Sequence, residues 1–175
     1  MNMTRTRLLC AVSCLAVATV LMGAPPLMAQ DDCKAMEKMV ANAFSQIHTI
    51  PTHVYSTTTI GGKAFSSEMI YAGGSMYMKM NGKWTMAGSI KDMEQVEKKA
   101  QQNTNSKDTC RYVREEPVNG EMGALYSSHS ETPKGNLDMQ TWVSKSSGRM
   151  LRQDIDSGAA VISTRYEYRD VIAPL

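Results

Sequence analysis

Three methionines at two-residue spacing are the first side chains in this sequence whose type and pattern suggest chemistry. Met76, Met78 and Met80 fall on one face of a strand-like segment. Their soft thioethers could bind Cu(I), could line an apolar cavity because methionine adapts to irregular shapes, or could pack in the core. Copper is the weakest alternative, because no histidine or cysteine accompanies the three. We therefore expect no metal site, and the cavity and the core both stay open.

The titratable residues match no catalytic pattern. His48 and His53 lie on either side of a proline rather than one helical turn apart, and His129 lies between two serines. The sequence has no Gly-x-Ser-x-Gly, His-Glu-x-x-His or Cys-x-x-Cys motif and no glycine-rich phosphate loop. We expect no catalytic residues, no cofactor and no enzymatic activity. An enzyme, the third hypothesis, would require ionisable side chains such as His129, Glu131 and Arg152 to cluster in a cleft.

The first 29 residues are predicted to be a cleaved secretory signal peptide. Arg5 and Arg7 precede an apolar run at 8–22, and a small residue, Ala29, fits the cleavage site. The run is too short for a membrane span. An alternative is a lipoprotein signal with lipidation of Cys14. We expect one domain at 30–175, without a transmembrane span, in the periplasm or secreted.

Charge and cysteine usage narrow the class further. The chain has 19 Lys and Arg against 17 Asp and Glu, and two of the basic residues fall in the predicted leader, so the remainder is neutral. A neutral domain without a basic patch argues against nucleic-acid binding. Cys33 and Cys110 follow the leader, and two thiols in an exported protein favour one disulfide over two free buried thiols.

Apolar periodicity predicts two helices and about nine strands. Apolar residues recur at three- and four-residue steps in the segments 31–48 and 89–102. Asn-Gly and Gly-Gly turns indicate antiparallel hairpins, and the strands are expected in meander order. The predicted strands are 54–60, 63–71, 76–80, 83–87, 109–117, 121–131, 136–145, 149–156 and 160–171.

Both faces of the strand at 136–145 carry apolar side chains. Trp142 shares a face with Asp138 and Gln140, whereas Met139 and Val143 lie on the other. A sheet that is partly apolar on both sides needs a cover on each side or a ligand on one.

Two segments near the C-terminus carry a resemblance to a known family. The segment 142–152, WVSKSSGRMLR, resembles the W-V-D-x-x-T-G-x-P-L-R hairpin of periplasmic lipoprotein-carrier-like proteins, the LolA/LolB-like superfamily that includes mycobacterial lipid-binding lipoproteins. The segment 166–171, YEYRDV, is similar to their closing strand, and the order of helices and strands is similar too. Ser144 replaces a common acidic residue and Met150 a common proline. The predicted disulfide is a further departure.

The resemblance implies an α+β fold: a curved antiparallel sheet, or half-open β-barrel, with two helices covering its open side. It also implies an apolar cavity for a lipid, acyl chain or other hydrophobic ligand. We expect an exported, monomeric, non-enzymatic binding protein. No residue matches the carriers' functional arginine, so no lipoprotein-transfer role is implied.

The alternative is a protein-interaction module with a solid core, such as an envelope regulator, inhibitor or immunity protein, whose partner is an envelope protein. The residues expected to line the cavity are Met76, Met78, Met80, Trp84, Met86, Trp142, Tyr166 and Tyr168.

Overall fold

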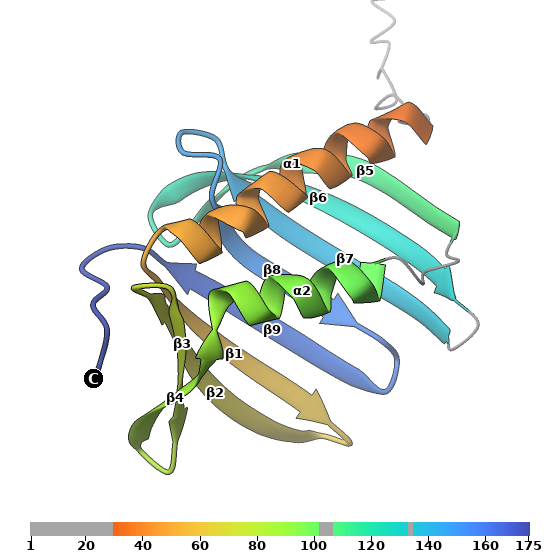
Figure 1. Cartoon of the computed structure of the whole chain (residues 1–175). Coiled ribbons are helices and arrows are strands. Elements are labelled where there is room, and N and C mark those ends of the chain that lie inside the picture. The colour runs from red at the N-terminus through yellow and green to blue at the C-terminus, as the bar shows by residue number, and fades with distance from the viewer. Residues whose placement is uncertain (1–29, 102–106, 133–134) are drawn as a thin grey trace, which may run out of the picture.

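The computed structural model describes residues 30–101, 107–132 and 135–175, without the side chains at 30–33, 35, 97–101 and 107. In this part of the chain it has two helices and nine strands (Figure 1). The helices are α1 (Gln30–Thr49) and α2 (Ile90–Gln101). The strands are β1 (Thr52–Ile60), β2 (Lys63–Ala72), β3 (Ser75–Met80), β4 (Lys83–Ser89), β5 (Lys107–Val118), β6 (Glu121–Thr132), β7 (Gly135–Ser144), β8 (Met150–Asp156) and β9 (Ala160–Glu167).

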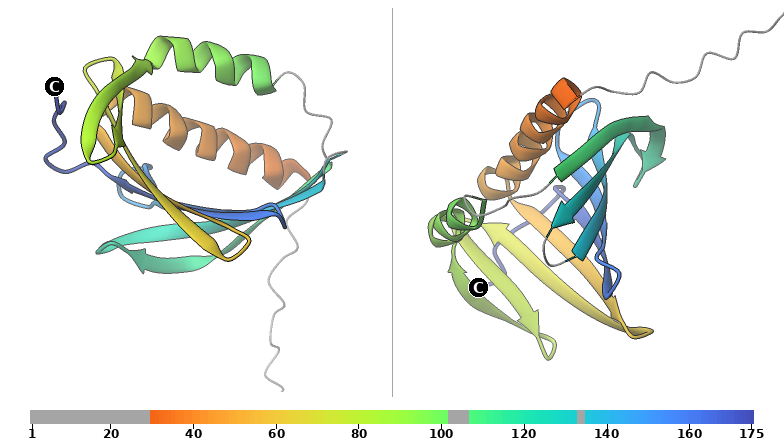
Figure 2. Two further views of the ribbon diagram at one scale, coloured as in Figure 1. Left: turned by 90° about the horizontal axis from the view of Figure 1, so that it is seen from below. Right: turned by 90° about the vertical axis from the view of Figure 1, so that its right-hand side faces the viewer.

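The nine strands form one antiparallel sheet in the order β4-β3-β2-β1-β9-β8-β7-β6-β5. The sheet is curved and not closed, which confirms the predicted half-open barrel. It departs from a single meander, because β1 pairs with β9 in the middle of the sheet. The consecutive strands β4 and β5 therefore lie at opposite edges, and α2 belongs to the connection between them (Figures 1 and 2).

Most strand ends follow from turn chemistry. Asn81 and Gly82 have φ values of 51° and 78°, and Asn119 and Gly120 have 53° and 82°, as two-residue hairpin turns require. The last strand ends earlier than predicted, at Glu167 rather than at residue 171. Its neighbour β1 explains this, because the ladder between them stops at the His53–Glu167 pair.

Helix α1 packs along the concave side of the sheet, against β2, β5, β7 and β8. Its apolar stripe places Ala43 and Ile47 among the buried residues. A core cluster forms between helices and sheet, and Met150 is fully buried in it. The other buried members are Ala43, Ile47, Val54, Tyr71, Ile90, Val143 and Tyr166.

Helix α2 is capped as the sequence predicts and is buried mainly at its beginning. The backbone N–H of Asp92 donates to Ser89 Oγ (3.1 Å), and that hydroxyl donates to the Asp92 carboxylate (2.7 Å). Ile90 is buried in the core, Met93 packs against the core, and Val96 is 68% exposed. Among the described side chains of this helix, burial therefore decreases from Ile90 to Val96, and α2 contacts β4 of the sheet.

Candidate functional site

Five of the eight predicted lining residues face the concave side of the sheet. Strand register places Met76 and Met78 beside Tyr71 and Met69, which contribute to the core on this side. Tyr166 belongs to the core cluster, and Met76 and Tyr168 pack against it. Met80 continues the same face of β3 and is 57% exposed. The concave methionines thus run from the core to the open end of the sheet.

The other three predicted lining residues, Trp84, Met86 and Trp142, lie on the outer face. Trp84 pairs with Lys79, whose Nζ lies 5.7 Å from the ring centroid, and Met86 pairs with Tyr77. The eight residues therefore do not share one surface. The two-residue turn after Met80 already places Trp84 opposite Lys79, so strand parity in the sequence contains this information.

Trp142 is buried in a small cluster on the outer face, with Leu125, Leu151 and nearby Val118. A bulge in the pairing of β7 and β8 places Leu151 between the residues paired with Trp142 and Val143. This re-aims Leu151 into the outer cluster. The β5–β6 hairpin bends toward the same side, away from the helices (Figure 2).

The predicted disulfide falls partly outside the described residues. Cys110 pairs with Ser128 on the concave face of β5, and α1 packs on β5. The side chain of Cys33 belongs to the part that the structure leaves undescribed. The Cys33–Cys110 bridge therefore stays a prediction.

A mainly apolar row, with four apolar side chains and one threonine, crosses five strands of the concave face beyond the core. We call Phe65, Thr58, Ile162, Ile155 and Met139 the concave apolar row, because strand register sets them side by side. Phe65 is 58% exposed and the other four are partly exposed. This surface is thus apolar without being fully buried.

A polar row separates the concave apolar row from the core. Ser56 and Thr164 bond through their hydroxyls across β1 and β9 (3.0 Å). Gln153 pairs with Thr164, and its side-chain amide donates to the Met139 sulfur (3.1 Å). The core under the helices and the concave apolar row are therefore two separate surfaces.

The outer face behind the concave apolar row is polar. Register places Ser66, Thr57, Ser163, Asp154 and Gln140 side by side there. Strand alternation therefore still sends apolar residues to the concave side and polar residues outward where burial is incomplete.

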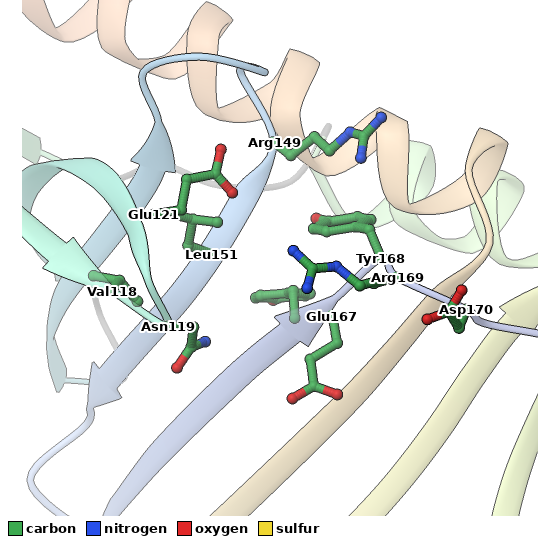
Figure 3. Close-up of a pocket in the computed structure, with 10 residues that line it drawn as sticks. Val118, Asn119, Glu121, Arg149, Leu151, Glu167, Tyr168, Arg169 and Asp170 are labelled. Carbon is green, nitrogen blue, oxygen red and sulfur yellow. The ribbon is translucent and has the colours of Figure 1, made fainter.

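An open pocket of about 630 Å³ lies at the C-terminal end of β9, away from the concave apolar row (Figure 3). We call it the arginine pocket, because Arg149 and Arg169 line it together with Asn119, Leu151 and Tyr168. The turn after β5, the start of β8 and the segment after β9 meet here. A second pocket of about 440 Å³ lies nearby on the outer face, beside Arg152 and Arg165.

Hydrogen bonds and burial shift several pKa values around these pockets. The hydroxyls of Ser144, Ser146 and Ser147 donate to the Glu121 carboxylate, and they lower the pKa of that carboxyl. Burial raises the pKa of the phenol of Tyr168 well above its usual range. Both groups therefore keep one charge state around neutral pH: Glu121 is anionic and the Tyr168 hydroxyl remains a donor.

The three histidines each lie beside one carboxylate. His48 Nδ1 is 3.6 Å from Glu94, His53 Nε2 is 3.3 Å from Glu68, and His129 Nδ1 is 2.7 Å from Asp138. Within the described residues, His, Cys, Asp and Glu form no group of three or more that could hold a metal ion. In that same part of the chain, no helix has the length and apolarity needed to cross a membrane.

Neither a protein-family model nor a curated protein matches the sequence, but solved structures resemble the fold. The lipoprotein LppX of Mycobacterium tuberculosis aligns over 83% of this chain and 99% of its own, with 11% identity and a TM-score of 0.51. LprF from Mycobacterium bovis aligns over 81% and 97%, with 9% identity and a TM-score of 0.45. MucB aligns over 83% and 62%, with 10% identity and a TM-score of 0.45. The chain has the fold of the LolA/LolB-like lipoprotein carriers that its hairpin and closing strand resemble, and at this identity the likeness shows the fold alone.

Proposed function

We propose that this protein is a cell-envelope binding protein that holds the apolar part of a ligand, such as an acyl chain, against the concave apolar row. The exposure of this row carries the proposal. Phe65 and the neighbouring Ile60 are 58% and 52% exposed although both face the concave side. An apolar surface inside a curved sheet is stabilised when a ligand removes it from water, by roughly 25 cal/mol for each Å² covered.

The course of α2 supports the same position for the ligand. Its first turn is anchored by buried Ile90, whereas Val96, six residues further on, is 68% exposed. Figure 2 shows α2 on the concave side of the curved sheet. We infer that the ligand lies between α2 and the concave apolar row, where it would cover both apolar surfaces.

We extend the proposal to the location and state of the protein. The predicted signal peptide at 1–29 lies outside the described residues, so export to the envelope rests on the sequence pattern. We infer a monomer that carries its ligand without catalysis. Its predicted disulfide would suit an oxidising compartment.

A matched pair of variants tests the binding surface. Ile162→Thr polarises the concave apolar row, while Val161→Thr makes a similar change at the neighbouring, exposed position of the outer face. Loss of buried apolar area should weaken binding of a fluorescent fatty acid by about tenfold in Ile162→Thr. Val161→Thr should bind as the wild type does.

Native mass spectrometry of the purified protein supplies the complementary measurement, since a retained ligand adds a discrete mass. Failure of the wild type both to retain a lipid and to take up the fluorescent fatty acid would remove the proposal. Equal affinities of the two variants would place the ligand elsewhere.

A protein partner is the second candidate, and the filled core under the helices favours it. Phe44, Met69 and Met93 pack against the buried core cluster, so side chains occupy this region themselves. In this case the concave apolar row would bind a protein segment. Cross-linking in the envelope fraction, with Ile162→Thr as the negative variant, would then recover a partner in place of a lipid.

A further inference from the structure

Three arginines of the outer face are each neutralised by a carboxylate on the same strand. Arg114, Arg152 and Arg165 form ion pairs with Glu116, Asp154 and Glu167, each two residues further along the same strand. Residues two apart share a strand face, so each guanidinium has a carboxylate beside it. The two arginines at the second pocket, Arg152 and Arg165, are both paired in this way.

The two arginines of the arginine pocket lack such a carboxylate. Leu151 and Val171 stand two residues after Arg149 and Arg169. Within the described residues neither guanidinium has an ion-pair partner. The pocket therefore contains two cationic groups whose charge no carboxylate neutralises at contact distance.

The carboxylates that line the same pocket are engaged elsewhere or directed away. Glu121 accepts hydrogen bonds from three serine hydroxyls and feels the Arg149 charge without forming an ion pair with it, and Glu167 pairs with Arg165 at 3.3 Å. In Figure 3 the carboxylates of Glu167 and Asp170 point away from the two guanidinium groups. The space around Arg149 and Arg169 is thus left for an external anion.

A fixed aromatic ring holds Arg149 in place. The guanidinium carbon of Arg149 lies 5.2 Å from the centroid of the Tyr168 ring. The Tyr168 hydroxyl donates to the backbone carbonyl of Met150 (2.8 Å), which fixes the ring. In the view of Figure 3 the ring lies between the two guanidinium groups. An ordered, planar guanidinium presents paired N–H donors that match a carboxylate or phosphate.

We propose that the arginine pocket binds an oxyanion, carboxylate or phosphate, that is attached to an apolar group. Arg149 binds the oxyanion, Arg169 adds a second positive charge to the same pocket, Asn119 offers a neutral amide donor, and Val118 and Leu151 contact the apolar part. The site is independent of the concave apolar row, because it lies at the far end of β9 from Ile162. It therefore adds a second binding site to the proposed function.

Calorimetric titration of the purified protein with octyl phosphate, octanoate and octanol tests the charge requirement. Because the concave apolar row would accept all three octyl chains, the titrations use the Ile162→Thr variant, in which that row is weakened. In this background octyl phosphate and octanoate should bind more tightly than octanol, because only they carry a charge for the arginines. Replacement of both arginines, Arg149→Gln with Arg169→Gln, should weaken octyl phosphate binding by more than about tenfold, since one charge-assisted contact contributes about a factor of ten and the second positive charge adds to it. Equal binding of octanol, or unchanged binding by the double variant, would overturn the proposal.

Arg111→Gln is the matched control. Arg111 is exposed on β5, outside both pockets, and has no ion pair among the described residues, so its replacement removes an equally free charge. Its affinity for octyl phosphate should stay within about twofold of the wild type. A loss of affinity equal to that of the double variant would show that any positive charge has the same effect, and it would contradict the proposed site. Circular dichroism confirms that each variant is folded.

Competition distinguishes the two sources of such an anion. Dihexanoyl phosphatidic acid presents a lipid head group, and phenyl phosphate presents a small soluble phosphate. Displacement of octyl phosphate by either one supports the proposal and identifies the source, while displacement by neither contradicts it. Fatty-acid uptake at the concave apolar row should be unchanged in the double variant, so the two proposals fail separately.

Discussion

The two faces of the sheet are held together by different kinds of contact. On the concave face, apolar side chains from α1, α2 and five strands are buried together. On the outer face, cations lie over aromatic rings: Arg165 is 4.5 Å from the Tyr55 ring centroid and Arg152 is 4.9 Å from that of Trp142. The same strands therefore present an apolar core on one side and a solvated, charge-balanced surface on the other.

The two faces of the sheet contribute differently to the stability and to the solubility of the protein. Burying a large apolar side chain contributes about 1.5–3 kcal/mol, whereas an exposed ion pair contributes roughly 0–1 kcal/mol. The paired arginines of the outer face cover aromatic surface without leaving net charge. We infer that the concave face stabilises the fold, and that the outer face mainly keeps the second side of the sheet compatible with water.

Met150→Ala should produce the largest loss on the concave face. Met150 is fully buried in the core cluster, so its truncation removes apolar contacts and leaves a cavity. The free energy of unfolding should fall by roughly 2–5 kcal/mol. Urea denaturation measures it. A loss of unfolding free energy as small as that expected for Arg165→Gln would contradict the conclusion that the concave face stabilises the fold.

Leu125→Ala tests the buried cluster of Leu125, Trp142 and Leu151 on the outer face. Leu125 is almost fully buried beside Trp142 and Leu151, but this cluster has few members and lies at the surface. Its neighbours can close over part of the cavity, so we expect a loss near the lower end of the same range, about 2 kcal/mol. A loss of stability greater than that of Met150→Ala would show that the main core lies on the outer face and not on the concave face.

Glu121→Gln should change the pH dependence of stability. Serine hydroxyls hold the pKa of Glu121 below its usual value of 4.5 in the folded state, so the carboxylate stabilises the fold above that pH. This contribution is lost as the pH falls below 4.5 and through the folded-state pKa. The stability difference between wild type and variant should therefore shrink in acid. Thermal unfolding between neutral pH and pH 3 measures it.

Ser146→Ala provides the companion variant for that experiment, because it removes one of the three hydroxyl donors to Glu121. It should show the same acid-dependent difference with a smaller amplitude. A stability difference between wild type and Glu121→Gln that is constant with pH would contradict this role for the carboxylate.

Arg165→Gln should have the smallest effect. Arg165 stacks on Tyr55 and pairs with Glu167, but all three side chains are accessible to water. The expected loss of unfolding free energy is below about 1 kcal/mol, and salt should reduce it further. A loss comparable to that of Met150→Ala would show that the outer face carries the fold after all.

Local structure could be predicted from the sequence because local chemistry determines it. The Asn81-Gly82 and Asn119-Gly120 turns have the expected positive φ values, and the Ser89 cap begins α2. The two-residue alternation correctly assigned Ile162 and Tyr166 to one face of β9. It assigned Ser163 and Arg165 to the other face. Each of these features depends on neighbours in the chain.

Features that depend on distant contacts could not be predicted in this way. The pairing of β1 with β9 follows from the whole sheet, since no short pattern selects one antiparallel neighbour over another. The arginine pocket joins Asn119, Arg149 and Arg169 through the bend of a hairpin and the course of the last segment. Strand parity would have predicted the outward position of Trp84. The prediction that Trp84 lines the cavity relied only on its being a large apolar residue, and it was wrong for that reason.

The central pairing of β1 with β9 has a consequence for biogenesis. Thr57 lies opposite Ser163, so the first and last strands must meet before the two sets of hairpins become one sheet. Contacts of such long sequence separation form slowly. A ribosome-bound chain that still lacks its final strand has two unjoined sets of strands, and it cannot complete the sheet until its C-terminal segment has emerged.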